Sequence, residues 1–318
     1  MVRPGLIVVA TLALASCGSA GEDVPRAAID AEWPTIPDDA VFGQVSAVDV
    51  DSHGHIFVLH RAGRVWEEPF PDKPIAEPTV FMFAPGGALL ARWGAGEFVM
   101  PHGLSIDEGD NVWITDVARE QVMRFSHDGA QQLVLGERGV TVQDAGHFGR
   151  PADTAFLGNR VLIADGYVNT RVAEFDRSGA FLRDWGKFDI AHSVAVDDEH
   201  IYVADRENAR IAVFDHAGQL VESRRTPTGG HPYGVAALGS GWLVAVEGRD
   251  RNDTFGAIVR VYTPEGEVER SLDVSNPDAA TSLGHDIALG PDGMAYVADV
   301  YGDRVVRFEL SPAQDPAE

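Results

Sequence analysis

Short apolar runs alternate with Asp- and Gly-rich turns along most of the chain. Runs such as Leu104–Ile106 and Val112–Thr115 have the alternating character of β-strands with one buried face. The turn between them reads Asp-Glu-Gly-Asp (107–110), a composition typical of β-hairpins. Because no helical periodicity of any length interrupts this pattern, the sequence predicts an all-β fold.

These runs belong to a unit that recurs along the chain. Each copy has three apolar runs and usually a fourth, such as 180–185. Units of about 40–50 residues with four antiparallel strands are typical of propeller blades. We therefore predict a six-bladed β-propeller over residues 39–310. Its six repeats begin at Val45, Pro101, Pro151, Ala191, Pro232 and Gly284.

The last repeat ends after three strands, so we expect a segment between Trp33 and Phe42 to close the ring. Trp93-Gly94 and Trp185-Gly186 recur at the same place in their repeats, which predicts packing between blades. The pattern resembles the NHL repeat, including the proline, Pro101, that follows Trp93-Gly94.

The amino-acid composition and net charge mainly limit the kinds of molecule that the protein can bind. The chain has 318 residues, 45% of them hydrophobic, which is enough for one large domain. Its net charge of −24 and its lack of basic clusters argue against nucleic acid as a partner. So negative a molecule would attract cationic ligands.

The N-terminus predicts export. An apolar run, Gly5–Leu14, follows Arg3 and is too short to span a bilayer. It ends in Leu-Ala-Ser-Cys, which resembles a bacterial lipobox whose Cys17 is acylated. The alternative is an ordinary secretory signal with an incidental cysteine. Cys17 is the only cysteine, so no disulfide forms within the chain.

We accordingly predict a lipid-anchored protein of the bacterial cell envelope that meets the membrane only through this anchor. The predicted segments are a lipoprotein signal peptide (1–17), a tether (18–38), the propeller (39–310) and a C-terminal tail (311–318).

Histidines recur at one position of the repeat, the start of the innermost strand. Alternate blades of a six-bladed ring are related by a threefold rotation, so the three imidazoles would converge on the channel axis. Three protein nitrogens with an open fourth position are how catalytic zinc is held. Each histidine could instead be a structural residue, and three histidines alone do not distinguish zinc from another transition metal. Around the ring the start position holds Ser46, His102, Ala152, His192, Tyr233 and His285.

A second position, the hairpin after the second strand, faces the same mouth. Most blades have an acidic residue there, which we interpret as a cap of the turn. Beside it lie Arg61, Tyr167 and Arg206, placed to overhang the histidines. Arginine binds carboxylates bidentately, and a tyrosine near a metal and two cations can act as a base. The alternatives are surface ion pairs and a phenol that packs a loop.

Asp286 directly follows the last of these histidines. A carboxylate directed into the channel suits a hard cation such as calcium, together with backbone carbonyls. Asp153 occupies the same position in the third blade, so a turn-capping role is the alternative.

Several stretches together point to one family. From Gly43 to about Leu310 the chain resembles the peptidyl-α-hydroxyglycine α-amidating lyases, the lyase half of the bifunctional peptide-amidating enzyme. The stretches that carry the resemblance are Gly43–Ser46, His60–Arg61, Val65–Trp66, Pro101–Asp107, Thr115–Val117, Asp165–Tyr167 with Asn169 and Arg171, Val203–Asn208 and His285–Ile287.

The resemblance implies a zinc-dependent lyase that cleaves the C–N bond of a peptidyl- or N-acyl-α-hydroxyglycine to give an amide and glyoxylate. It implies Tyr167 as the general base and Arg61 and Arg206 as active-site arginines. A structural calcium ion is implied at Asp286 with the backbone carbonyls of Val48 and Leu104. The implied zinc ligands are His102, His192 and His285.

The chain departs from the family in three ways. Val168, Tyr202 and Val213 stand where disulfide cysteines are expected, and Leu283 replaces a methionine before the last histidine. We find no hydroxylating domain in the 318 residues. We therefore expect the hydroxylated substrate to come from a separate monooxygenase or from metabolism, and a small N-acyl or ureido compound fits as well as a peptide.

Two other functions fit a propeller. A non-catalytic NHL propeller that binds a peptide or envelope component predicts no bound metal and no role for Tyr167. A calcium-dependent lactonase-like propeller would use carboxylate and asparagine ligands, whereas the mouth here is built from histidines.

Overall fold

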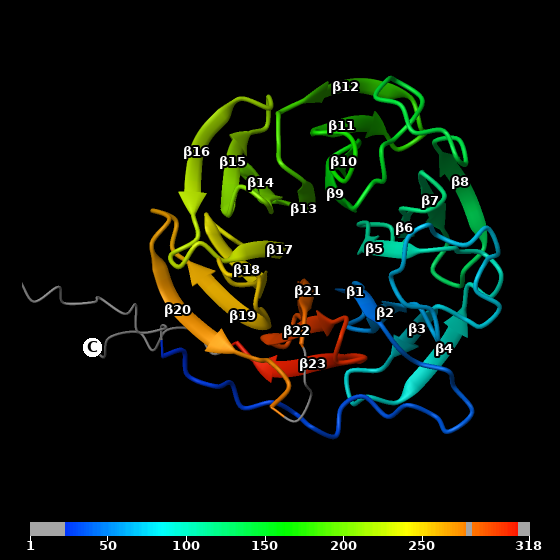
Figure 1. Ribbon diagram of the computed structural model, residues 1–318, viewed down its shortest axis with the longest axis horizontal. Coiled ribbons are helices and arrows are strands. Elements are labelled where there is room, and N and C mark those ends of the chain that lie inside the picture. Colours follow the sequence, from blue (N-terminus) through cyan, green and yellow to red (C-terminus); the bar gives the residue numbers. More distant parts are fainter. Residues whose placement is uncertain (1–22, 278–281, 311–318) are drawn as a thin grey trace, which may run out of the picture.

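The computed structural model describes residues 23–277 and 282–310, which contain 23 strands and no helix. The strands form six antiparallel sheets around a central channel, five with four strands and one with three (Figure 1). The predicted six-bladed propeller is therefore confirmed. The predicted signal peptide with Cys17 and the tail 311–318 lie outside the described residues. Within the described ranges, no helix is long and apolar enough to cross a membrane.

Each of the first three blades is a four-stranded meander whose first strand lines the channel. The strands are β1 (Val45–Val50), β2 (Ile56–His60), β3 (Val80–Phe83) and β4 (Leu89–Trp93); β5 (Pro101–Ile106), β6 (Val112–Asp116), β7 (Gln121–Phe125) and β8 (Gln131–Leu135); β9 (Asp153–Leu157), β10 (Arg160–Asp165), β11 (Arg171–Asp176) and β12 (Phe181–Trp185).

The other three blades repeat this order, and the sixth lacks a fourth strand. Their strands are β13 (Ala191–Val196), β14 (His200–Asp205), β15 (Arg210–Asp215) and β16 (Leu220–Arg225); β17 (His231–Gly239), β18 (Trp242–Arg249), β19 (Phe255–Tyr262) and β20 (Val268–Asp273); β21 (Gly284–Leu289), β22 (Met294–Asp299) and β23 (Arg304–Glu309).

The core is divided into layers, each between two neighbouring blades. Leu59 of the first blade, for example, packs in one cluster with Ile114 and Met123 of the second, all three fully buried. The recurrent tryptophans belong to these layers: the Trp93 ring lies 5.2 Å from Phe125, and Trp185 lies 4.6 Å from Phe214. The predicted packing between blades is thus confirmed for both tryptophans.

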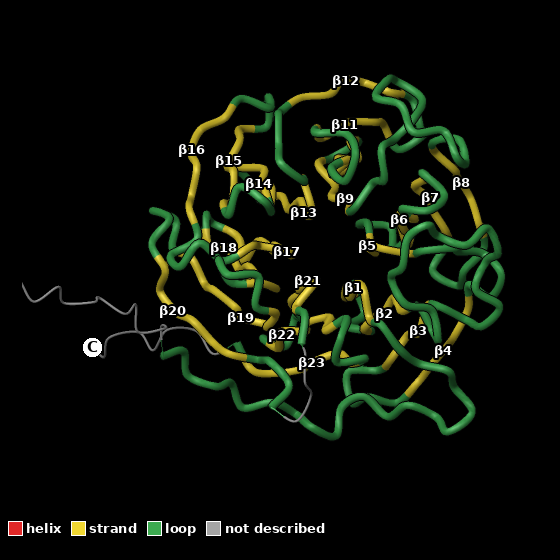
Figure 2. Tube along the Cα trace, in the orientation of Figure 1, coloured by secondary structure: helices red, strands yellow, loops and turns green. Residues whose placement is uncertain are grey.

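The segment that closes the ring lies earlier in the chain than predicted. Ile29 pairs antiparallel with Phe308 of β23, and the Asp30 N–H donates to the Arg307 carbonyl at 2.9 Å. Trp33 does not pair as a strand. Its side chain is buried, only 6% exposed, and its ring lies 5.1 Å from that of Tyr296. The tryptophan fills the seam between the first and sixth blades. The strand-like pairing with β23 is therefore made by the residues before it. Figure 2 shows this part of the chain as a loop along β23.

Candidate active site

Irregular pairing directs side chains into the channel at the start of the innermost strands. Five of these strands have a β-bulge at this point, and a bulge leaves one residue unpaired and re-aims its side chain. The unpaired residues include Ser46, His102, His192, Tyr233 and His285. The repeat position identified in the sequence therefore coincides with a β-bulge that directs its side chain into the channel.

The three predicted histidines come together on the channel axis. Ring centroids are 4.9 Å apart for His102 and His192, 4.6 Å for His102 and His285, and 4.8 Å for His192 and His285. The triangle is nearly equilateral, all three side chains are buried, and their ligand nitrogens lie within 4.8 Å of one another. Nitrogens this close to one another can share a single metal ion.

Each histidine is oriented by the next blade. In all three, Nδ1 donates to the backbone carbonyl at the start of the neighbouring innermost strand, which leaves the Nε2 lone pair facing the axis. The contacts are His102 Nδ1 to Ala152 O (2.8 Å), His192 Nδ1 to Tyr233 O (2.7 Å) and His285 Nδ1 to Ser46 O (2.7 Å).

Burial also sets the protonation of this triad. Desolvation lowers the pKa of His102 and His192 well below the usual value and that of His285 to about 3. The imidazoles are therefore neutral at neutral pH, the form that binds a metal.

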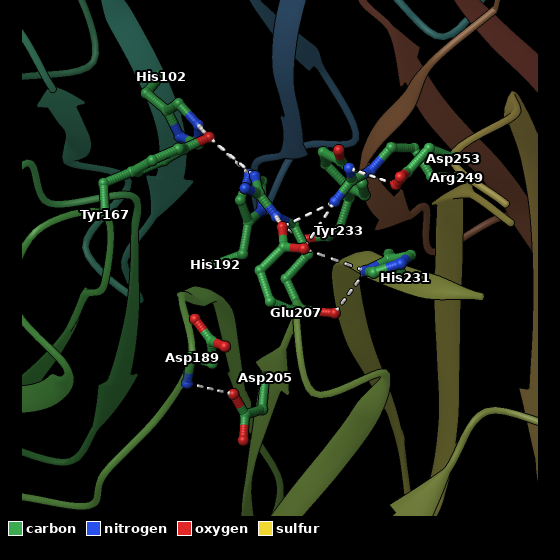
Figure 3. A network of polar contacts seen from close by, with 11 residues as sticks. His102, Tyr167, Asp189, His192, Asp205, Glu207, His231, Tyr233, Arg249 and Asp253 are labelled. Atoms are coloured by element: carbon green, nitrogen blue, oxygen red, sulfur yellow. Dashed lines mark hydrogen bonds and ion pairs between the residues drawn. The ribbon is translucent and has the colours of Figure 1, made fainter. Parts of the chain in front are cut away.

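Tyr167 closes the open side of the triad. Its hydroxyl lies 2.9 Å from His102 Nε2 and 3.1 Å from His192 Nε2, and Arg206 NH1 donates to it at 3.2 Å (Figure 3). Gly166 permits this approach, because a Cβ there would collide with the Ala191 backbone. The structure thus brings together the predicted tyrosine, one predicted arginine and the histidines.

Arg61 is the second predicted arginine, and it reaches the site beside a residue to which the sequence assigned no role. Its Nε donates to the Pro101 carbonyl at 3.1 Å, next to His102, whereas its buried NH2 has no hydrogen-bond partner among the described residues. The Trp66 ring lies 5.4 Å from the guanidinium carbon and 5.5 Å from the Tyr167 ring. Trp66 therefore forms a wall between arginine and tyrosine.

A second tyrosine, Tyr233, also borders the triad. The Tyr233 ring lies 4.9 Å from that of His192, and the Arg206 guanidinium carbon lies 4.8 Å from Tyr233. Burial raises the pKa of Tyr233 to about 12, so its hydroxyl keeps its proton at neutral pH. Arg206 Nε donates to the Glu207 carboxylate at 2.8 Å, and this carboxylate balances the positive charge of the guanidinium.

The acidic residues of the hairpin position accept hydrogen bonds from backbone N–H groups. Asp165 accepts the Gly149 N–H at 2.7 Å, Asp205 the Asp189 N–H at 2.8 Å, and Asp299 the Leu283 N–H at 2.8 Å. Since each tie fixes the chain leading into an innermost strand, these carboxylates support the site without facing it.

Beneath the triad, the channel widens into a cavity of about 330 Å³. Val48, Leu104 and Asp286 line it, together with Asp49 and Asp153. Burial raises the pKa of Asp49 to about 7, that of Asp153 to about 6 and that of Asp286 well above its usual value. Such a set of buried, mutually repelling carboxyls has the oxygen chemistry of a hard-cation site.

Each of these carboxylates accepts a backbone N–H of the next blade. Asp153 bonds Val194 N at 3.0 Å, so it spans two blades and does not cap a turn. Asp286 bonds Val48 N at 3.1 Å. Asp49, which sequence reasoning missed, bonds Ile106 N at 2.7 Å; its place on the channel-lining strand was the available signal.

Comparisons with known proteins agree with this architecture. Residues 188–214 match the family model described as NHL repeat. The chain is 32% identical to the Xenopus laevis peptidyl-glycine alpha-amidating monooxygenase B over 90% of its length, but it spans about a third (36%) of that relative. It is 32% identical to a Caenorhabditis elegans protein named probable peptidyl-alpha-hydroxyglycine alpha-amidating lyase pgal-1, covering 84% of this chain and 83% of the relative. A streptogramin B lyase structure matches with a TM-score of 0.57 at 12% identity, over 86% of this chain and 95% of that one, which is a likeness of fold.

Proposed function

Because the chain belongs to the peptidyl-α-hydroxyglycine α-amidating lyase family, we propose that it is a zinc-dependent lyase acting on a peptidyl- or N-acyl-α-hydroxyglycine. The products would be an amide and glyoxylate. The observation that carries the proposal is the near-equilateral histidine triad with the Tyr167 hydroxyl within 3.1 Å of two of its Nε2 atoms.

The donor set fits the metal. His102, His192 and His285 would hold it through Nε2, and the Tyr167 hydroxyl lies beside these nitrogens. Zinc bound there supplies Lewis acidity that makes a substrate hydroxyl easier to deprotonate.

Side chains of the protein are proposed to transfer the proton of the substrate hydroxyl. Ionised Tyr167 takes the proton of the substrate hydroxyl, the carbon–oxygen bond becomes the aldehyde of glyoxylate, and the C–N bond breaks. The same proton passes from Tyr167 to the departing amide nitrogen, so the cycle needs no other reactant. Arg206 NH1, which donates to this oxygen at 3.2 Å, stabilises the negative charge that the oxygen carries before the first transfer and again after the second.

Arg61 is proposed to bind the substrate carboxylate through NH2, its unpartnered nitrogen. We expect Arg61→Ala to lower kcat/KM by roughly 10- to 100-fold, mainly through KM, because a hydrogen bond to a charged group contributes about 1.5–3 kcal/mol. The measurement compares an N-acyl-α-hydroxyglycine with the N-hydroxymethyl amide that lacks the carboxylate. The variant should lose rate only with the first substrate, and equal losses with both would remove this role.

The channel cavity is proposed to hold calcium at Asp286 with the carbonyls of Val48 and Leu104. We expect Ca²⁺ to raise Tm, and more so at about pH 7.5 than at about pH 5, since protons compete for carboxyls whose pKa burial has raised. For Asp49, ionisation opposes folding of the metal-free protein as pH rises from 3.8 to about 7. Thermal melts of Asp286→Asn should show no calcium effect, and a wild-type shift in that variant would place the ion elsewhere.

The reaction itself is tested by glyoxylate release from α-hydroxyhippurate, with and without a chelator. Release that the chelator abolishes and zinc restores supports the proposal. No release from folded, zinc- and calcium-loaded protein would favour a propeller that only binds its ligand.

A further inference from the structure

A second group of metal-binding side chains lies on the face of the propeller opposite to the triad. Asp51, His53 and His55 belong to the β1–β2 turn, and His127 belongs to the β7–β8 turn. In an antiparallel meander both turns lie at the far end from the starts of the innermost strands. One ligand atom from each residue lies within 4.8 Å of the others, and we call these four residues the peripheral histidine cluster.

The Asp51 carboxylate is the centre of this cluster. Its Oδ1 accepts the N–H groups of His53 at 2.9 Å and His55 at 2.7 Å, which fixes the carboxylate. Its Oδ2 lies 2.9 Å from His55 Nδ1, 2.8 Å from His127 Nε2 and 3.9 Å from His53 Nδ1. The Asp51 side chain is fully buried beneath the three rings, of which His53 is the most exposed at 64%.

The second blade offers a comparison for this position. Asp107 is the matching turn residue, and its Oδ1 likewise accepts two turn N–H groups. Its Oδ2, however, is met by Trp113 Nε1 at 2.9 Å and by the Arg177 guanidinium at 2.8 Å. Arg177 occupies the same turn position in the third blade as His127 does in the second. Three imidazoles have thus replaced a permanent positive charge beside a buried carboxylate.

A buried carboxylate requires a compensating charge. A divalent cation supplies that charge and also uses the ring nitrogens as ligands. The set of three nitrogens and one carboxylate oxygen is typical of tetrahedral zinc, which keeps its ligand atoms about 3.3 Å apart. The Oδ2 contacts of 2.8, 2.9 and 3.9 Å bracket that value. His53 is also 3.5 Å from Asp110, a second carboxylate at the rim.

We propose that the peripheral histidine cluster binds one divalent transition metal ion of the zinc type, which fastens the first blade to the second. The site is structural and distinct from the triad, and it stands whether or not the proposed lyase reaction is correct. His53 and the rim carboxylate Asp110 lie at its open side, where the ion would enter.

The test uses His127→Arg, which supplies a guanidinium like the one that Arg177 of the third blade directs at Asp107. Wild type and variant are loaded with zinc chloride alone and desalted, and zinc per chain is then measured by atomic emission. We expect His127→Arg to retain one zinc ion fewer per chain and to lose the corresponding part of the zinc-dependent rise in Tm. Its Tm without zinc should match or exceed that of wild type, and glyoxylate release should be unchanged.

The matched control is His216→Arg. His216 occupies the same turn position in the fourth blade but contacts the backbone carbonyl of Asp197 at 3.0 Å. This variant should retain all of the zinc. His53→Ala provides a second loss variant with little effect on folding, because His53 is exposed. Equal zinc content in wild type, His127→Arg and His53→Ala would overturn the proposal, and because only differences are compared, failure of the triad to bind zinc would not affect the result.

Discussion

His192→Ala is expected to abolish both the stably bound axial metal and the lyase reaction. The substitution removes one of three nitrogens and leaves only His102 and His285 as ligands, which hold a metal far less tightly. A bound Lewis acid contributes several kcal/mol to the transition state, so its loss lowers kcat/KM by about three orders of magnitude. Metal content after desalting and the rate of glyoxylate release measure the two effects.

A histidine outside the mouth serves as control. His200 begins β14, and its Nδ1 has no hydrogen-bond partner among the described residues. His200→Ala should therefore keep both metal and activity. Full retention of the metal by His192→Ala would contradict the ligand assignment, and retention of activity without metal would contradict the mechanism.

Tyr167→Phe is expected to keep the metal and lose turnover. The ring retains its packing against Trp66, while the oxygen that exchanges the proton is gone. General acid–base groups typically contribute 10²- to 10⁴-fold, and we expect a loss of about that size in kcat. Metal analysis and steady-state kinetics of the same preparation separate the two properties.

Tyr233→Phe is the matched control for this loss. Tyr233 also contacts the triad, but burial raises its pKa to about 12, which keeps the proton on its hydroxyl. Its replacement should change kcat by less than about tenfold. Wild-type turnover in Tyr167→Phe would remove that residue as the base, and equal losses in both variants would indicate a packing effect instead.

Much of the fold and of the site could be predicted because equivalent positions of the six repeats can be compared with one another. Six copies of one unit define which positions face the mouth, so residues that differ from the other copies, such as His102 and Tyr167, stand out. The metal itself remains a prediction, because its identity depends on more than donor types.

The features that sequence reasoning missed depend on contacts between blades. Asp49 meets Ile106 in the next blade, and the role of Asp153 is set by Val194. Trp66 lies in a long connection whose path no repeat pattern fixes. The closing pairing of Ile29 was misplaced because an isolated bridge leaves no strand-like run in the sequence. In each case the partner is distant in sequence and is defined only once the ring has formed.

The contact from His285 to the Ser46 carbonyl joins the last blade to the first, across 239 residues of chain. The N-terminal residues hold the ring closed from outside, because Ile29 pairs with β23 of the last blade and Trp33 fills the seam between that blade and the first. Binding of the proposed metal on the axis and docking of Ile29 on the rim would thus favour the same closed ring. Linkage makes such a coupling reciprocal: each event must strengthen the other by an equal free energy. Tension applied to the chain ahead of Arg26 would therefore weaken binding of the proposed metal at the centre of the propeller.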